Sequence, residues 1–130
     1  MEYNFSGGRI DGDLLTGGKV DAVKGLIKRV VTATDDATAV IDVTITDVYQ
    51  LSAVANATAF STTGTPVDGQ TLIIRFKDAG AAKGLTWDAI FEVVGVTLPV
   101  TTVAGKWHYV GCQYCAAASK FHVLAVSVQA

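Results

Sequence analysis

The sequence predicts an all-β protein: an antiparallel β-sandwich or jelly-roll-like domain that follows an extended, glycine-rich N-terminal arm. Thr and Val recur through most of the chain, and β-branched side chains fit a pleated sheet. Turn-forming residues recur roughly every eight to twelve positions, as is typical of sandwiches. Residues 70–77 give the clearest strand pattern, because Leu72, Ile74 and Phe76 alternate with Ile73, Arg75 and Lys77.

The segment 1–26 differs from the rest of the chain. It contains glycine pairs at positions 7–8 and 17–18 with aspartates between them, which favours an arm rather than a core. A short helix over residues 19–30 is the alternative, since apolar residues recur there at helical spacing. Gly25 and the β-branched residues weaken that helix. We therefore expect an arm over 1–26 and a domain over 27–130.

The strands follow in order from residue 28. The first half predicts strands at 28–34, 39–44, 48–54, 57–61 and 70–77, with turns at Asp35-Asp36 and over 63–69. The second half predicts strands at 84–87, 89–94, 98–103, 106–114 and 120–128. The last two strands should form a hairpin across 116–119, with Gln113 opposite His122 and far from His108. We find no internal repeat and no linker.

Composition narrows the function. The chain has 130 residues, half of them hydrophobic, a mean hydropathy of +0.39 and a net charge of −2. Without clustered Lys and Arg, nucleic acid is not an expected partner. The N-terminus lacks the features of a signal peptide, and no apolar stretch has the roughly 20 residues that a membrane span needs. We expect synthesis in the host cytoplasm and an apolar surface that partner chains cover.

The strand over 106–115 gives the best indication of a partner. Trp107 and Tyr109 should share one face, while Tyr114 shares the other with apolar neighbours. A strand with two apolar faces is buried on both sides, and the second cover would be another subunit. Trp107, Tyr109 and Tyr114 are therefore the candidate oligomer-interface residues.

No set of residues predicts catalysis, and we expect no cofactor, no metal and no enzymatic activity. Cys112 and Cys115 spell CxxC, but positions i and i+3 of a strand point to opposite faces, and a zinc ribbon needs a second ligand pair. His108 and His122 should lie too far apart for a joint site, and neither completes a triad. The scattered aspartates suit turns, where their side chains bond nearby backbone groups.

Several short motifs resemble segments of structural proteins of tailed bacteriophages. These motifs lie at residues 64–80, 85–91, 96–99 and 106–126, so the resemblance covers roughly 46–130. It implies a β-sandwich-type virion module, usually oligomeric and here expected to be a homotrimer. It carries over no catalytic residues, and it does not extend to residues 1–45.

Three functions follow from these observations. The first is a capsid decoration (cement) protein, whose arm binds the major capsid protein or another virion protein through Tyr3, Phe5, Leu14 and Leu15. Arms that order on binding can cover large surfaces. The second is a tail fibre, spike or baseplate module that binds a host surface glycan. The third, a small enzyme such as a glycan hydrolase, has the least support.

Overall fold

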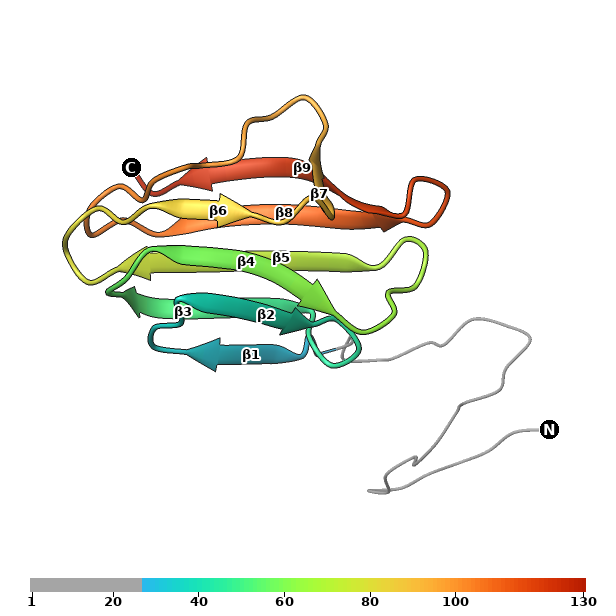
Figure 1. Ribbon diagram of the computed structural model, residues 1–130, viewed down its shortest axis with the longest axis horizontal. Helices are drawn as coiled ribbons and strands as arrows, with labels where there is room; N and C mark the ends of the chain where they lie inside the picture. The colour runs from blue at the N-terminus through green and yellow to red at the C-terminus, as the bar shows by residue number, and fades with distance from the viewer. Residues whose placement is uncertain (1–26) are drawn as a thin grey trace, which may run out of the picture.

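A computed structural model describes residues 27–130; the expected arm, residues 1–26, lies outside the described part. The described chain is all-β and contains no helix, which confirms the all-β part of the predicted fold class (Figure 1). Residues 27–30 are therefore not helical, and the rest of the alternative helix over 19–30 lies outside the described residues. The strands are β1 (Val30–Ala33), β2 (Thr38–Asp42), β3 (Val48–Val54), β4 (Thr58–Thr63), β5 (Thr71–Asp78), β6 (Leu85–Trp87), β7 (Phe91–Val93), β8 (His108–Cys115) and β9 (Lys120–Val128).

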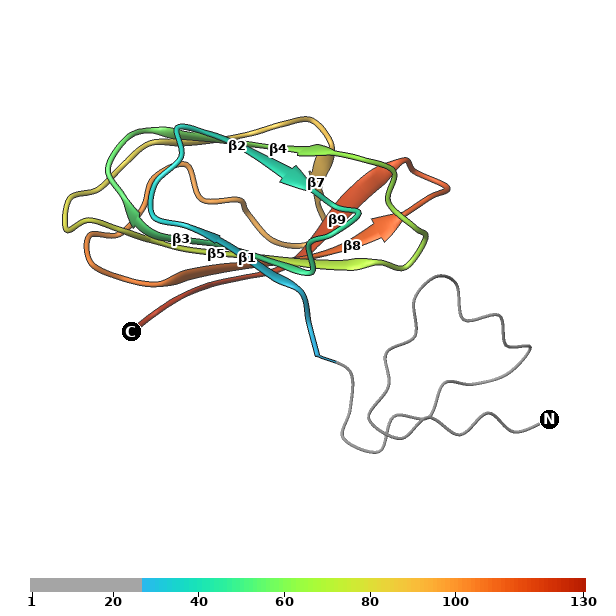
Figure 2. The ribbon, with the colours of Figure 1, turned by 90° about the horizontal axis from the view of Figure 1, so that it is seen from below.

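The strands form two layers that face each other, as in a sandwich (Figure 2). The larger sheet has six strands in the order β1-β3-β5-β8-β9-β7, and the smaller sheet has three in the order β2-β4-β6. Consecutive strands from β1 to β6 thus alternate between the sheets.

Within each sheet these first six strands are parallel. The chain winds through three coils, each with one strand in either sheet, like a short two-sided solenoid. The expected antiparallel order is therefore wrong for this half. Each crossover between parallel neighbours is made by a strand of the opposite sheet, so no hairpin is required.

Antiparallel pairing is confined to the C-terminal part. β8 pairs antiparallel with β5 and β9, whereas β7 runs parallel to β9. The predicted hairpin across 116–119 is confirmed, and Gln113 lies opposite His122 as expected. His108 lies at the other end of the hairpin, opposite Val128.

Most of the predicted strands are present with shifted ends, but the strand predicted over 98–103 is wrong. The long connection there keeps one isolated bridge, between Thr101 and Gly84. Its backbone instead fastens the connection to β6, since Leu85 N–H donates to the Val100 carbonyl (2.8 Å) and Trp87 Nε1 donates to the Pro99 carbonyl (2.8 Å).

The core fills the space between the two layers. Leu72, Ile74 and Phe76 of β5 are fully buried, as the alternation predicted. The rings of Phe60 and Trp87 from the smaller sheet stack 4.4 Å apart, and Phe60 lies 5.4 Å from Phe76 of the larger sheet. Aromatic contacts therefore join the layers.

Candidate functional site

The outer face of the six-stranded sheet carries one apolar row that crosses five strands. Its members are successive register partners, namely Val30, Val48, Ile73, Gly111 and Ala125. Ile73 is 38% exposed and Val30 47%, whereas the neighbouring residues of β5, Leu72 and Ile74, are fully buried. The row therefore faces away from the core, and it lies open at Val30 and Ile73 in the single chain.

Aromatic side chains extend this row. Tyr109 is 44% exposed and lies between Arg75 and Ser127 in the register, and Trp107 precedes it in the chain. We define the outer-face patch as Val30, Ile73, Trp107, Tyr109 and Ala125. Arg75 beside it donates through Nε to Gln50 Oε1 (2.7 Å), so one charged side chain at the border of the patch is held in place.

A cleft of about 330 Å³ lies at the C-terminal end of the patch. It is lined by Trp107, Tyr109, Ser127, Val128 and Gln129. The Gln129 N–H donates to the Trp107 carbonyl (2.8 Å), and the Trp107 N–H donates to Gln129 Oε1 (3.2 Å). These bonds hold the end of the chain against β8. The cleft therefore brings the rings of Trp107 and Tyr109 together with the Ser127 hydroxyl and the Gln129 amide.

The sequence placed Trp107 and Tyr109 on one face and Tyr114 on the other, and the structure has them so. Tyr114 packs on the core side, with its ring 5.1 Å from that of Phe121. Tyr114 is thus separated from the outer-face patch. Sequence reasoning missed Ile73 and Ala125, although the exposed side of the alternation in β5 includes Ile73.

The expected arm anchors, Tyr3, Phe5, Leu14 and Leu15, lie outside the described residues.

Buried polar groups form a closed cluster near the end of β5. Asp78 accepts hydrogen bonds from the Thr102 hydroxyl (2.6 Å), the Gly105 N–H (2.7 Å) and the Gly80 N–H (2.9 Å). Burial alone would raise the pKa of Asp78, but these three bonds outweigh it and lower that pKa below its usual value. Three of the roughly four acceptor sites of this carboxylate are thus occupied by loop groups, so Asp78 fastens loops.

His108 lies beside this cluster and is likewise occupied. Its Nε2 accepts the Val103 N–H (3.0 Å), so Nδ1 carries the proton and donates to the Lys106 carbonyl (3.0 Å). The ring stacks on Phe76 at 5.0 Å. His122 is on the hairpin's other arm and lies 3.4 Å from Glu92 Oε1, on the neighbouring strand β7. The two histidines are not brought together.

The two cysteines have different surroundings. Cys112 is buried, and burial raises the pKa of its thiol to about 12. Cys115 is half-buried and pairs with Lys120 at the end of the hairpin, further along the same strand. A strand directs these two positions to opposite faces. Within residues 27–130, no group of three or more His, Cys, Asp and Glu side chains could hold a metal ion.

Asp36 and Asp88 serve turns, as the sequence predicted: Asp36 accepts the Thr38 N–H (3.0 Å) and Asp88 the Ile90 N–H (2.9 Å). Asp68 instead accepts the N–H of Ala116 (2.9 Å), 48 residues further along, so it joins its own loop to the β8–β9 turn.

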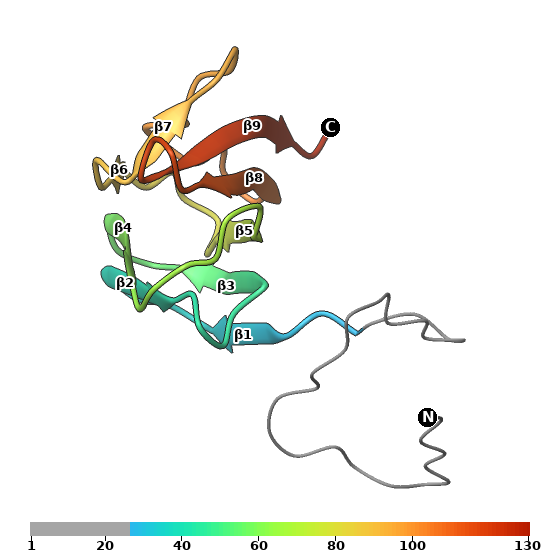
Figure 3. The same ribbon diagram turned by 90° about the vertical axis from the view of Figure 1, so that its right-hand side faces the viewer.

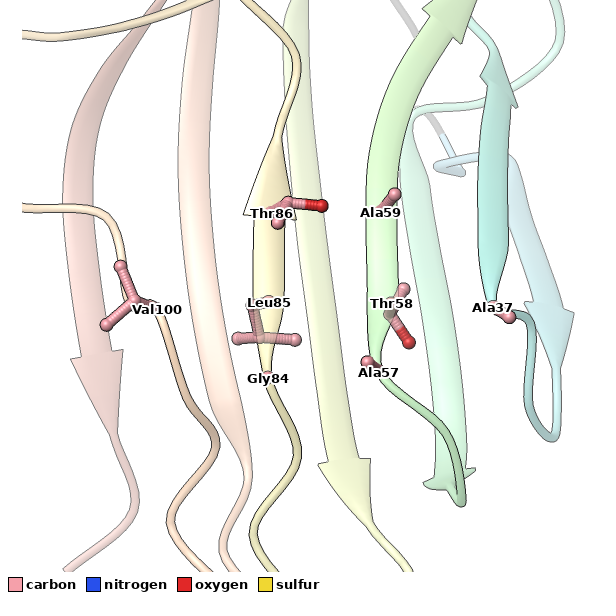
Figure 4. A pocket seen from close by; sticks show the side chains of 8 residues that line it. All are labelled: Ala37, Ala57, Thr58, Ala59, Gly84, Leu85, Thr86 and Val100. Carbon is pink, nitrogen blue, oxygen red and sulfur yellow. The ribbon is translucent and has the colours of Figure 1, made fainter.

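A second hollow, about 440 Å³, lies on the smaller sheet (Figure 4). Its lining comes from β4, β6 and adjoining segments and consists of Ala37, Ala57, Thr58, Ala59, Gly84, Leu85, Thr86 and Val100. No titratable side chain is among them, so this hollow has no acid–base chemistry.

Comparison with protein-family models, with curated proteins and with solved structures gave no match to this chain. Among residues 27–130 there is no helix of the length and apolar character needed to cross a membrane.

Proposed function

We propose that the chain is a non-enzymatic structural protein of a tailed-bacteriophage virion, a capsid decoration (cement) protein that assembles as a homotrimer on the head and stabilises it. The outer-face patch is the observation that carries this proposal. It places exposed Val30, Ile73 and Tyr109 on one broad sheet face, and apolar side chains gathered on one exposed face favour an interaction site. The resemblance of residues 46–130 to phage structural proteins supports the virion as the assembly.

The state of the buried polar groups supports a structural role over catalysis. No buried side-chain nitrogen or oxygen among the described residues lacks a hydrogen-bond partner. Asp78 and His108, the buried ionisable side chains with the most partners, are both engaged with loop backbone. An acid–base pair needs at least one group that is open to a reacting atom.

Residues 1–26 complete the proposal as the attachment element to the major capsid protein or another virion protein, with Tyr3, Phe5, Leu14 and Leu15 as anchors. Deletion of 1–26 should leave the β-domain folded and weaken particle binding. Circular dichroism of the truncated chain and its co-sedimentation with particles check this. Unfolding of the truncated chain would show that the arm belongs to the core, and undiminished binding would show that it is not the attachment element.

Locating the chain in the particle tests the function itself. Particles encoded by the genome that carries this gene would be purified, analysed by mass spectrometry and labelled with antibodies against the chain. We expect the chain in the virion and the label on the head. A chain absent from purified virions would overturn the proposal.

The cleft of Trp107, Tyr109, Ser127 and Gln129 favours a second candidate, a tail fibre, spike or baseplate module that binds a host surface glycan. Aromatic faces stack on sugar rings, while an amide and a hydroxyl can bond to sugar hydroxyls. Label on the tail, together with glycan binding that Trp107→Ala abolishes, would support this function. Label on the head would exclude it.

A further inference from the structure

The first coil is an open end of the two-layer stack. β1 is the edge strand of the larger sheet and β2 that of the smaller sheet, and no described strand pairs with their outer sides. At the opposite end, β8 and β9 continue the larger sheet beyond β5. Figure 3 shows β1 and β2 together at one end of the molecule, with β9 at the other.

The unpaired backbone groups of β1 can be assigned. The Arg29 carbonyl accepts the Val48 N–H (3.0 Å), so it points toward β3. The N–H and C=O of one residue point to the same side of a strand, and the sides alternate. Val31 and Ala33 therefore also face β3, while Val30 and Thr32 direct their donors and acceptors outward.

Apart from its short length of four residues, this edge lacks the features that usually prevent pairing. Natural edge strands are protected by short length, charged residues, proline, bulges or a covering element. The four residues of β1 are Val-Val-Thr-Ala, and they contain no charge and no proline. The register with β3 is regular over the whole of β1. An edge of this composition is suited to main-chain pairing with another strand.

Charges flank the edge with opposite sign at its two ends. Arg29 is held by Asp47 (2.8 Å), and Asp35 accepts bonds from the Ala55 N–H (3.0 Å) and the Asn56 amide (2.8 Å). Lys28 before the strand is exposed and Asp36 after it is half-buried, and neither has an ion pair with another described residue. The edge is thus positive where it begins and negative where it ends.

We propose that β1 pairs antiparallel with β1 of a second copy of this chain, about a twofold axis at Thr32. The backbone N–H and C=O groups that point outward belong to even-numbered residues of β1. An even-numbered residue of one copy must therefore pair with an even-numbered residue of the other copy. With Thr32 opposite Thr32, Val30 lies opposite Thr34. The Thr34 carbonyl already accepts the Ala53 N–H (2.8 Å), so Thr34 takes part through its N–H alone.

The same register brings the flanking charges together. Lys28 of one copy lies near Asp36 of the other, just beyond the paired residues. The twofold axis generates a second, identical pair of Lys28 and Asp36, so opposite charges meet at both ends of the paired strands.

This contact uses the sheet edge and is separate from the outer-face patch of the proposed trimer. Chains that used both contacts would link trimers to one another through twofold edge contacts. Substitution of Tyr109 should leave the edge contact in place, so failure of the trimer and failure of this proposal are distinguishable.

Thr32→Pro tests the main-chain pairing in the full chain. The Thr32 N–H faces outward, so proline should be tolerated in this edge strand while it removes the donor. We expect the association constant from sedimentation velocity to fall about tenfold or more, since the twofold removes two main-chain bonds. Thr32→Val, which keeps the N–H, is the matched control and should associate like the wild type. A folded T32P chain that associates as well as T32V overturns the proposal.

Charge exchange tests the register without proline. K28E and D36K should each weaken association, because each places like charges near one another. The double variant K28E/D36K should regain it, and an equimolar mixture of the two single variants should form mixed pairs. A double variant no better than the single ones overturns the register.

Hydrogen exchange identifies what covers the edge. The amides of Val30 and Thr32 should exchange rapidly at low concentration and slowly at high concentration. Slow exchange at every concentration would overturn the proposal, because another part of the same chain would then occupy the edge.

Discussion

Single residues whose conformation is constrained locally give the sharpest tests of the fold. Gly64 has φ of +84°, and a Cβ there would lie 2.8 Å from Thr44 Cγ2. Gly69 has φ of +79°, but a Cβ there would meet nothing within 4 Å. Both glycines have a positive φ, but only Gly64 has a close neighbour at the Cβ position. Comparing alanine variants at the two positions therefore separates the cost of backbone strain from the cost of steric contact.

We therefore predict that Gly69→Ala lowers the free energy of unfolding by about 1 kcal/mol and that Gly64→Ala lowers it by about 2–3 kcal/mol. Chemical denaturation of both variants measures the difference. Equal losses would show that Thr44 moves aside at no cost.

The two thiols should differ in reactivity. The thiolate is the reactive form, and burial holds the pKa of Cys112 at about 12. We predict that a thiol reagent modifies Cys115 in the folded protein and Cys112 only after unfolding. The variant Cys115→Ser should then show no modification in the folded state, and rapid labelling of that variant would contradict the burial of Cys112.

The ionisation of Asp47 makes the free energy of unfolding depend on pH in the acid range. Its hydrogen bonds from the Arg29 side chain and backbone lower the pKa of Asp47 to about 2, against an unfolded value near 3.9. A lowered folded pKa gives stability that is complete above about pH 4 and is lost as pH falls toward 2. Because the Arg29 side chain is half exposed, we expect about 1 kcal/mol from this pair.

Asp47→Asn should remove that part of the acid dependence, whereas Arg29→Met should remove only the share that comes from the Arg29 side chain, because the Arg29 backbone N–H still donates to Asp47. Urea unfolding from pH 7 to pH 2 measures it for both variants. A double variant whose loss equals the sum of the single losses would show that the two side chains are not coupled.

At the scale of elements, the connection between β7 and β8 has no ladder and is held by a few backbone bonds near β6 together with side-chain bonds. The Thr102 hydroxyl donates to Asp78 (2.6 Å) and accepts the Lys83 N–H (2.8 Å). Thr102→Val keeps the shape but removes both bonds. We predict a loss of about 1–3 kcal/mol and faster hydrogen exchange over residues 99–106. Thr101→Val at the exposed neighbour is the control, and equal effects at both positions would contradict this role.

The positions of strands could be predicted, because alternation and turn residues act over a few neighbours. β3 was predicted with its full bounds, and Asp36 and Asp88 were assigned the right role in turns. Strand direction could not be predicted, because alternation is the same in parallel and antiparallel neighbours. The segment 98–103 was misassigned because its apolar residues suit a strand, whereas its backbone bonds to β6 through tertiary contacts.

At the scale of the whole molecule, the coils could not be recognised as a repeat because their lengths differ. Val30 pairs with Val48, and Val48 pairs in turn with Ile73, so the second coil is longer than the first. The outer-face patch was predictable only in part. Trp107 and Tyr109 were identified from one strand, but Ile73 and Ala125 join them through register, which sequence does not supply.

The patch leads to a prediction about the size of the assembly. Tyr109→Asp removes an exposed aromatic ring and places a charge beside the apolar row of the outer-face patch, so it should convert trimers to smaller species while the melting temperature stays within a few degrees. Light scattering measures the mass. Gln113→Glu, an exposed position on the same strand, is the control and should leave the mass unchanged. A tyrosine variant of unchanged mass would exclude this face as the trimer contact.

The winding order also bears on how the chain matures on the ribosome. The second and third coils each pair with the coil just before them, so the coils can dock in the order of synthesis, N-terminal segments first. β5 is different, because its second neighbour, β8, begins only at His108, after β6, β7 and the long connection have been made. Until that segment leaves the exit tunnel, the nascent chain carries an unpaired edge on β5, which makes this interval of translation the one most exposed to misassembly.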